Sequence, residues 1–368
     1  MGKLMRRWSR SLRSVLQSIP MLRACKRAWS VFLSSLTEAS SPAISPEPPT
    51  NSLNVQADEK TVVSQQWGKT AAQREKMSLM GWMDAPLVLD YYVLPTIAQG
   101  SSQGNAMLDI IEQFPIDRQG HWLSLGCGSA GQEIFYSQNK LFASMDAYDI
   151  SEGAIQIARA NAEAKGITNI CFQVQDINKI SLPPTHYDVV SMIMSLHHVS
   201  RLGYLLDQVE RTLKPNGWFL VNEFIGPSQF QFSAKQMQIV NELLALLPER
   251  LAFDYVKNQV KRRYDLQPRD FWDRVDPSEA IHSDQIEAAL HHRFQVVSRR
   301  NYGGTLLNPL LEHIVGNFAP EREEDVVILR LLMYIEAVLI REGCLKDNFA
   351  LFVMKKKHKP FWSNLFRI

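Results

Sequence analysis

The stretch L-S-L-G-C-G-S-A-G, residues 123–131, decides the fold class. It ends an apolar run and places glycines at 126, 128 and 131 with the spacing G-x-G-x-x-G. In such a loop between a strand and a helix, the backbone can approach a ligand closely, because glycine has no Cβ. Three interpretations are open at this point: a pyrophosphate cradle for NAD or FAD, a loop for another adenosine ligand, or a tight turn.

The residues around this loop alternate between apolar runs and helical patterns. The predicted strands are 121–126, 144–150, 169–176, 187–194 and 217–224, and the predicted helices between them are 132–139, 152–165 and 202–213. Gly166 is placed to end the second of these helices in a left-handed conformation. Strands that alternate with helices of this length form β-α-β units and a parallel sheet.

The pattern changes after the fifth strand. Residues 227–290 are polar and mostly helical, and strands predicted at 293–300 and 348–355 then flank a long helix, 323–343. The last two strands can add an antiparallel edge to the sheet. The prediction is an α/β, Rossmann-like fold with a seven-stranded, mostly parallel sheet and an antiparallel edge strand. The helical insertion at 227–290 follows the carboxyl end of strand five, where open α/β sheets bind ligands, so we interpret it as a lid.

Two acids follow the second and third strands. Asp149 ends the second strand, where it can accept hydrogen bonds from both ribose hydroxyls of an adenosine ligand. Asp176 ends the third strand in the segment Q-D-I. Asp149 could instead cap the next helix, and Asp176 could be a turn residue. Neither position distinguishes NAD from other adenosine ligands.

Five segments, taken in chain order, resemble the successive motifs of class I S-adenosylmethionine-dependent methyltransferases. They are L-S-L-G-C-G-S-A-G, A-Y-D-I-S, V-Q-D-I, Y-D-V-V-S-M-I-M-S-L-H-H-V and L-K-P-N-G-W-F-L-V-N-E. The resemblance covers residues 118–226 and implies a methyltransferase that uses S-adenosylmethionine. The aromatic insertion, whose charges nearly cancel, fits a cover over a small or mid-sized substrate, so we expect a small-molecule, lipid or glycan acceptor. Methylation of oxygen or carbon is favoured, because the fourth strand ends without the N-P-P-Y or D-P-P-Y motif of many nitrogen methyltransferases.

The resemblance also implies which residues bind the cofactor. They are Gly126, Cys127, Gly128, Gly131, Asp149, Ile150, Asp176, Ile177 and Met194. The glycine loop would lie along the methionine part, Asp149 would bind the ribose and Ile150 would contact the adenine. Asp176 and Ile177 would contact the adenine amino group and ring, and Met194 would lie near the sulfonium.

The loop departs from the family pattern at two positions. Many members have an acid where this chain has Ser124, and that acid usually helps to hold the amino-acid end of the cofactor. The third glycine of the usual loop is replaced by Ala130, with Gly131 one residue later. Both departures concern the methionine side of the predicted site.

Candidates for a general base lie at the carboxyl edge of the predicted sheet. They are Glu223, at the end of strand five, and His197 and His198, after strand four. A base is needed only where the acceptor is a hydroxyl or a carbon acid. The histidines could instead pack or touch the cofactor, and Glu223 could be a buried partner of an arginine or a helix terminus.

Two other functions stay open. A nicotinamide-dependent oxidoreductase would use the same glycine loop, although the chain lacks a Tyr-x-x-x-Lys motif. A non-catalytic adapter of the same fold could bind the cofactor or a partner. The four cysteines lie far apart, without a C-x-x-C pair or a histidine at metal-ligand spacing, so we expect no metal site.

The N-terminal segment differs in charge from the rest of the chain. Residues 1–37 hold eight basic residues and no acid, and their pattern predicts two basic amphipathic helices interrupted at Pro20. Such helices fit a membrane surface, or a docking site on the body or on a partner. Residues 38–61 are predicted to be a flexible linker and 62–368 the methyltransferase domain. We expect a cytoplasmic protein, peripheral at the inner face of a membrane if these helices bind lipid.

The remainder of the chain is mildly acidic, because the net charge of the whole protein is only +2. Proteins that bind nucleic acids neutralise phosphates with basic surfaces, so we expect no nucleic-acid partner. Oligomeric state does not follow from the sequence.

Overall fold

A computed structural model describes residues 63–65, 81–98 and 105–357, which all belong to one compact unit, residues 56–368. The predicted N-terminal helices (1–37) and the whole predicted linker (38–61) lie outside the described residues. In the described part of the chain, no helix combines the length and the apolar character that a membrane span requires.

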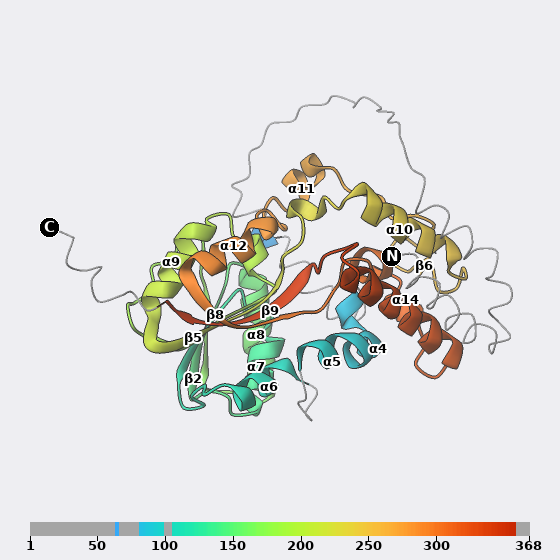
Figure 1. Ribbon diagram of the computed structural model, residues 1–368. Helices are drawn as coiled ribbons and strands as arrows, with labels where there is room; N and C mark the ends of the chain where they lie inside the picture. The colour runs from blue at the N-terminus through green and yellow to red at the C-terminus, as the bar shows by residue number, and fades with distance from the viewer. Residues whose placement is uncertain (1–62, 66–80, 99–104, 358–368) are drawn as a thin grey trace. The chain divides into compact units, whose positions relative to one another are not determined.

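A seven-stranded sheet forms the centre of this unit (Figure 1). Its strands are β1 (His121–Leu125), β2 (Ser144–Asp149), β3 (Ile170–Val174), β4 (Tyr187–Ile193), β5 (Leu213–Phe224), β8 (Phe294–Asn301) and β9 (Phe349–Lys356). Their order across the sheet is β3-β2-β1-β4-β5-β9-β8. The seven-stranded, mostly parallel sheet is therefore confirmed. The antiparallel strand is β9, which lies one place inside the edge, and β8 forms the edge itself.

Strand β5 begins earlier than the sequence predicted. The helix before it, α9 (Leu202–Thr212), ends one residue short of its predicted end, and Leu213 already pairs with Tyr187 of β4. A register irregularity between Tyr187 and Val189 then accommodates the Pro215–Gly217 segment within the strand. Pairing with β4 thus extends the strand through residues whose composition predicts a turn.

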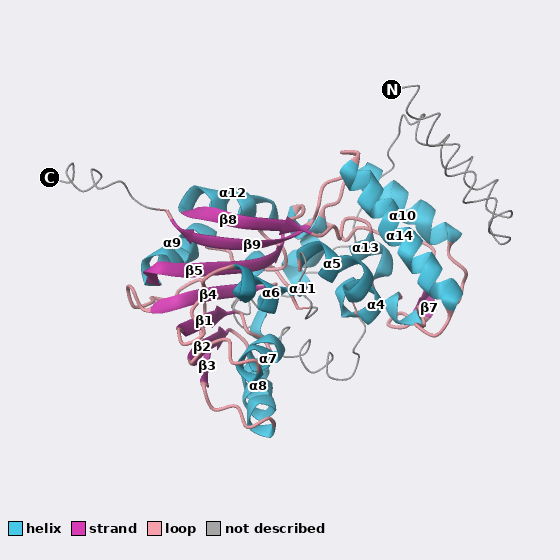
Figure 2. Ribbon diagram, turned by 60° about the horizontal axis from the view of Figure 1, so that its bottom comes forward, coloured by secondary structure: helices cyan, strands magenta, loops and turns pink. Residues whose placement is uncertain are grey.

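Helices cover both faces of the sheet (Figures 1 and 2). On one face, α9 and α12 (Ser283–Arg293) pack their leucines and isoleucines on Leu123, Val190 and Phe352 of the strands. On the other face lie α6 (Ala106–Gln113), α7 (Gly131–Gln138) and α8 (Glu152–Ala164). The alternation of β1 explains this, because Leu123 and Leu125 point to one face and Trp122 to the other.

Local sequence signals define the ends of α8. The Ser151 hydroxyl accepts a hydrogen bond from the N–H of Ala154 at 3.2 Å and so caps the start of the helix. At the other end, Gly166 has φ +66°, the left-handed conformation predicted for it. These two signals fix both ends of α8. The cap residue, Ser151, lies two residues after Asp149 and so also fixes where the helix starts relative to Asp149.

The segment after β5 contains α10 (Ala234–Leu246) and α11 (Arg269–Val275). It also contains a small hairpin, β6 (Phe253–Asp254) and β7 (Gln259–Val260), which the sequence analysis missed. Helix α12, which includes residues 283–290 of the predicted insertion, packs on the sheet through Ile286 and Leu290. The segment after β5 that does not pack on the sheet therefore ends before α12.

Further helices belong to the N-terminal part and to the connection between β8 and β9. They are α4 (Pro86–Val88), the π-helix Leu89–Val93, α5 (Leu94–Ile97), α13 (Leu307–Leu311) and α14 (Glu323–Arg341). Helix α13 contacts both α10 and α14, so the insertion after β5 and the β8–β9 connection share one apolar core.

The glycine loop between β1 and α7 is pressed against the turn that follows β4. Gly126 has φ +78°, and a Cβ at this position would lie 2.4 Å from the Cβ of Ser195. Gly131, by contrast, is the first residue of α7, lies outside the left-handed region and has no heavy atom within 4 Å of a built Cβ. Position 126 therefore has no room for a side chain, whereas position 131 does.

Gly126→Ala should lower the free energy of unfolding by about 2–4 kcal/mol, because it combines left-handed backbone strain with overpacking against Ser195. Gly131→Ala is the matched control and should change it by less than about 0.5 kcal/mol. Denaturant unfolding of the three proteins measures both effects. Equal stability of Gly126→Ala and the parent would contradict this packing of the loop.

Candidate functional site

The glycine loop leaves open space next to its second glycine, Gly128. The N–H groups of Gly126 and Cys127 donate to the Tyr148 carbonyl at 2.7 and 3.1 Å, which anchors the loop to the end of β2. Gly128 has φ +53°, and a Cβ there would meet no atom within 4 Å. The loop thus offers an open backbone surface that fits a ligand lying against it.

Ala130 is the position where the chain departs from the usual glycine. It has φ +60° and ψ 29°, a left-handed conformation that favours glycine, and its side chain is buried. Cys127 is also buried, and burial raises the pKa of its thiol well above the usual value. Cys127 therefore packs as a small apolar residue of the loop.

Asp149, at the end of β2, stabilises the loop through hydrogen bonds. One of its oxygens accepts a hydrogen bond from the N–H of Gly128 at 2.9 Å, and the other accepts one from Ser151 at 2.8 Å. Burial raises the pKa of this carboxyl, although these backbone donors act in the opposite direction. The carboxylate is held beside the open loop, where the sequence predicted a ribose ligand.

A cleft of about 400 Å³ lies on the adenine side of the predicted site. Asp176 lines it together with Tyr148, Val174 and Lys179. One Asp176 oxygen accepts the N–H of Asn178 at 3.0 Å and the other lies 3.4 Å from the Lys179 ammonium. Asp176 is thus in part a turn residue, and it still lines the cleft.

The remaining predicted cofactor residues lie at the ends of strands. Ile150 directly follows β2, and Ile177 is partly buried beside the apolar core under α9. Met194, directly after β4, has φ +53° and donates its N–H to the Asn222 carbonyl at 2.8 Å. A left-handed methionine is strained, and such strain concentrates at functional sites.

Glu133 is a residue that the sequence analysis missed. It lies in the first turn of α7, is buried, and accepts a hydrogen bond from the Ser124 hydroxyl at 2.7 Å. Burial raises the pKa of Glu133 to about 7, and the charge of Asp149 adds to the increase. A carboxylate therefore lies next to the position where Ser124 replaces the family's acid. The signal in the sequence was the acid in the first turn of the helix after the loop.

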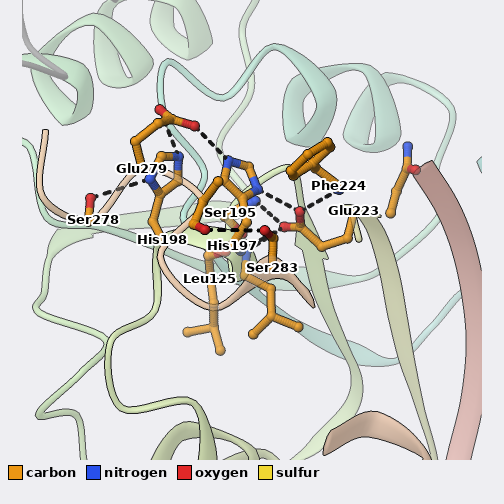
Figure 3. Close-up of polar contacts among 12 residues, drawn as sticks. Leu125, Ser195, His197, His198, Glu223, Phe224, Ser278, Glu279 and Ser283 are labelled. Atoms are coloured by element: carbon orange, nitrogen blue, oxygen red, sulfur yellow. Dashed lines mark hydrogen bonds and ion pairs between the residues drawn. The ribbon is translucent and has the colours of Figure 1, made fainter. Parts of the chain in front are cut away.

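Glu223 is fully buried at the end of β5, and both of its oxygens are already engaged (Figure 3). One oxygen accepts from the N–H groups of Ser195 and Leu196 at 2.6 and 2.5 Å. The other accepts from the N–H of Phe224 at 2.7 Å and lies 2.5 Å from His197 Nδ1. Because every partner is a donor, this carboxylate orients the turn and the imidazole. Its geometry does not suit the predicted role of a base in contact with the acceptor.

His197 and His198 lie in the short 3₁₀ turn after β4, next to Glu279 of the insertion (Figure 3). His197 Nε2 is 3.7 Å from one Glu279 oxygen and His198 Nε2 is 4.0 Å from the other. Burial lowers the pKa of His197, but the charges of Glu223 and Glu279 outweigh it and raise that pKa to about 8. Burial and the neighbouring His197 lower the pKa of His198 well below its usual value.

The insertion contacts this turn directly. The N–H of Ile281 donates to the His197 carbonyl at 3.1 Å, and the N–H of Gln229 donates to Ala280 at 2.8 Å. Two half-buried aromatic rings of the insertion, Phe230 and Trp272, lie 5.3 Å apart, and Phe230 is 5.0 Å from Phe224. The Phe224 ring is 6.5 Å from the His197 ring between centroids, so it joins the aromatic pair to the polar group formed by His197, His198 and Glu279.

Comparisons with known proteins agree with this architecture. Residues 116–266 match a family model described as a methyltransferase domain. The ubiquinone/menaquinone biosynthesis C-methyltransferase UbiE of Azotobacter vinelandii is 33% identical over 81 residues, which are 22% of this chain and 32% of that protein. The sterol 4-C-methyltransferase strm-1 of Caenorhabditis elegans is 25% identical over 128 residues, 34% of this chain and 38% of that protein.

The chain thus matches about a third of the length of these curated relatives. Among solved structures, the [4+2]-cyclase SpnF aligns with 81% of this chain and 96% of its own, at 12% identity and a TM-score of 0.46. From the matched model, the sheet order and the motifs in their expected places, residues 116–266 form a domain of the class I S-adenosylmethionine-dependent methyltransferase type.

Proposed function

We propose that this protein transfers the methyl group of S-adenosylmethionine to an oxygen or carbon atom of a small-molecule, lipid or glycan acceptor. The observation that carries the proposal is the open loop at Gly128 beside the Asp149 carboxylate, within a sheet of methyltransferase order. The cofactor, when bound, supplies a methyl group on a positively charged sulfur. The chain's part is to position the two reactants in line, which alone can lower the barrier by several kcal/mol.

In this proposal the cofactor lies across the carboxyl ends of β1 to β4. Asp149 accepts hydrogen bonds from the ribose, and the adenine occupies the cleft lined by Asp176, with Ile150 and Ile177 against the ring. Gly126, Cys127, Gly128 and Gly131 follow the methionine part, and Met194 lies toward the sulfur. Glu133, held by Ser124, takes the place of the family's usual acid and binds the ammonium group of the methionine part.

The acceptor side lies at His197 and His198, beneath the end of the insertion. The aromatic wall of Phe230 and Trp272 favours an acceptor with an apolar body, and the polar group next to it suits a hydroxyl or an acidic carbon. We propose that this group removes the acceptor's proton, with Glu223 as the positioning residue behind it. The names of the relatives, a quinone-pathway C-methyltransferase and a sterol C-methyltransferase, support a lipid-like acceptor.

The insertion would then act as the cover of the acceptor site, because its residues Ser278 to Ile281 contact the histidine turn. Residues 1–37 would bring the protein to a membrane surface where a lipid-like acceptor resides. Liposome flotation with and without residues 1–37 tests this membrane contact, and equal flotation of the two proteins would refute it.

Asp149→Asn should weaken binding of S-adenosylhomocysteine at least about tenfold, because a hydrogen bond to a charged group contributes about 1.5–3 kcal/mol. Isothermal titration measures this, with NAD as the comparison ligand. Glu152→Ala is the matched control, since it removes an exposed carboxylate near the start of α8. Unchanged binding in Asp149→Asn, or preference of the parent protein for NAD, would refute the proposed cofactor site.

Glu133→Gln should weaken binding of S-adenosylhomocysteine and leave binding of 5′-methylthioadenosine, which has no amino-acid part, unchanged. The pH dependence follows from the raised pKa of Glu133, about 7. An ammonium ligand requires the ionised carboxylate, so affinity is full above this pKa and falls as the pH falls through it. Titrations at pH 6 to 8.5 should show this step in the parent and lose it in Glu133→Gln.

The Asp149 carboxylate interacts with Glu133 and also has a raised pKa. The titration of Asp149 is therefore present in both the parent and Glu133→Gln. Ser124→Asp in the Glu133→Gln background restores an acid at the family position and should recover part of the affinity. If both ligands weaken equally in Glu133→Gln, the residue supports the loop and does not bind the ammonium group.

A further inference from the structure

Two imidazoles and one carboxylate converge at the acceptor side of the site. In His197, His198 and Glu279, one possible ligand atom from each side chain lies within 4.8 Å of the others. The histidines come from the turn after β4 and the carboxylate from the insertion (Figure 3). All three side chains are mostly enclosed, with exposed fractions of 6%, 15% and 17%.

Both imidazoles are oriented by hydrogen bonds at Nδ1. His197 Nδ1 lies 2.5 Å from Glu223, a carboxylate surrounded by donors, so this nitrogen carries a hydrogen atom. His198 Nδ1 lies 3.3 Å from the Ser278 hydroxyl oxygen. That hydroxyl donates its own hydrogen to Asp276 at 2.6 Å, so it accepts from His198. Both Nε2 atoms therefore face the Glu279 carboxylate.

A carboxylate, hydroxyl or carbonyl that holds Nδ1 while Nε2 binds a cation is the usual support of metal-ligating histidines. In a neutral imidazole with hydrogen on Nδ1, Nε2 carries a lone pair. A carboxylate that faces two imidazole Nε2 atoms is stabilised by a positive charge between them, which a proton or a metal ion supplies. Two histidines and one carboxylate also leave coordination positions open, as catalytic metal sites do.

We propose that His197, His198 and Glu279 bind one divalent transition-metal ion, of the Zn²⁺ or Fe²⁺ class, through the two Nε2 atoms and a carboxylate oxygen. Bonds of 2.0–2.1 Å in a tetrahedral arrangement place ligand atoms about 3.4 Å apart. The Nε2 atoms lie 3.7 and 4.0 Å from two different Glu279 oxygens, so the Glu279 side chain must rotate to bring one oxygen to an ion that both imidazoles bind. The ion needs no redox change to act here.

The consequence for chemistry rests on the proposed function. An open position on the metal would face the acceptor and lower the pKa of a hydroxyl held there, with release of its proton to water. The histidines would then act as ligands of the metal and not as bases. The metal would promote the loss of the acceptor's proton. Binding of the metal itself requires no acceptor and no cofactor.

The test uses the full chain, stripped of metal with a chelator and titrated with Co²⁺, whose visible absorption reports nitrogen and oxygen ligands. One equivalent should bind, and Zn²⁺ should displace it. His198→Ala and Glu279→Gln should each weaken Co²⁺ binding at least about 100-fold. Glu279→Gln is the milder variant, because its side chain is partly exposed, and thermal unfolding checks that both variants are folded.

A second group of possible ligands supplies the matched control. His121, Asp146 and His186 also converge, at the amino ends of β1, β2 and β4. His186→Ala should leave Co²⁺ binding unchanged, since this group lies at the other end of the strands. Binding lost in His186→Ala and kept in His198→Ala would overturn the proposal, as would absence of Co²⁺ binding to the parent.

The outcome is separable from that of the proposed function. If the metal-free protein binds S-adenosylhomocysteine but no Co²⁺, the metal site fails, and a proton alone joins the three side chains. If Co²⁺ binds as predicted and S-adenosylhomocysteine does not, the metal site stands and the proposed methyl transfer fails.

Discussion

The buried carboxylate of Glu223 joins the two halves of the site. It accepts hydrogen bonds from the turn after β4, including Ser195, and it orients His197. Ser195 in turn donates its hydroxyl to the Leu125 carbonyl at 2.7 Å and packs against Gly126. The chain of contacts therefore runs from the histidine turn, the proposed acceptor side, through Glu223 to the glycine loop. Loss of a buried carboxylate with this many donors would leave several N–H groups unpaired, at about 1–3 kcal/mol each.

Much of the fold follows from the sequence, because strands buried on both faces produce continuous apolar runs. The five parallel strands, the helices between them and the left-handed Gly166 were predicted from such runs and from capping residues. The start of β5 at Leu213 and the inner position of β9 were not, since each depends on pairing with a strand distant in sequence. Local composition contains no information about the partner strand.

The same limit applies to the site. Asp149 and the glycines lie on adjacent strand ends, so a short pattern reveals them together. Glu133 faces Ser124 only because α7 folds back over the end of β1, and Glu279 reaches the histidines from the far end of the insertion. Glu223 was selected for its position at a strand end. Its burial and its hydrogen bonds with the turn after β4 and with the N–H of Phe224 depend on tertiary contacts, which a strand-end position does not reveal.

The proposed reaction is methylation of an acceptor with an apolar body at the carboxyl edge of the sheet. The most direct measurement is incubation with S-adenosylmethionine labelled in the methyl group, together with a fractionated extract that contains small molecules, lipids and glycans. We expect labelled product in an organic-soluble, low-mass fraction, and loss of that product in Asp149→Asn. Label confined to protein or nucleic acid, or a protein that binds the cofactor and yields no labelled product in any fraction, would contradict it.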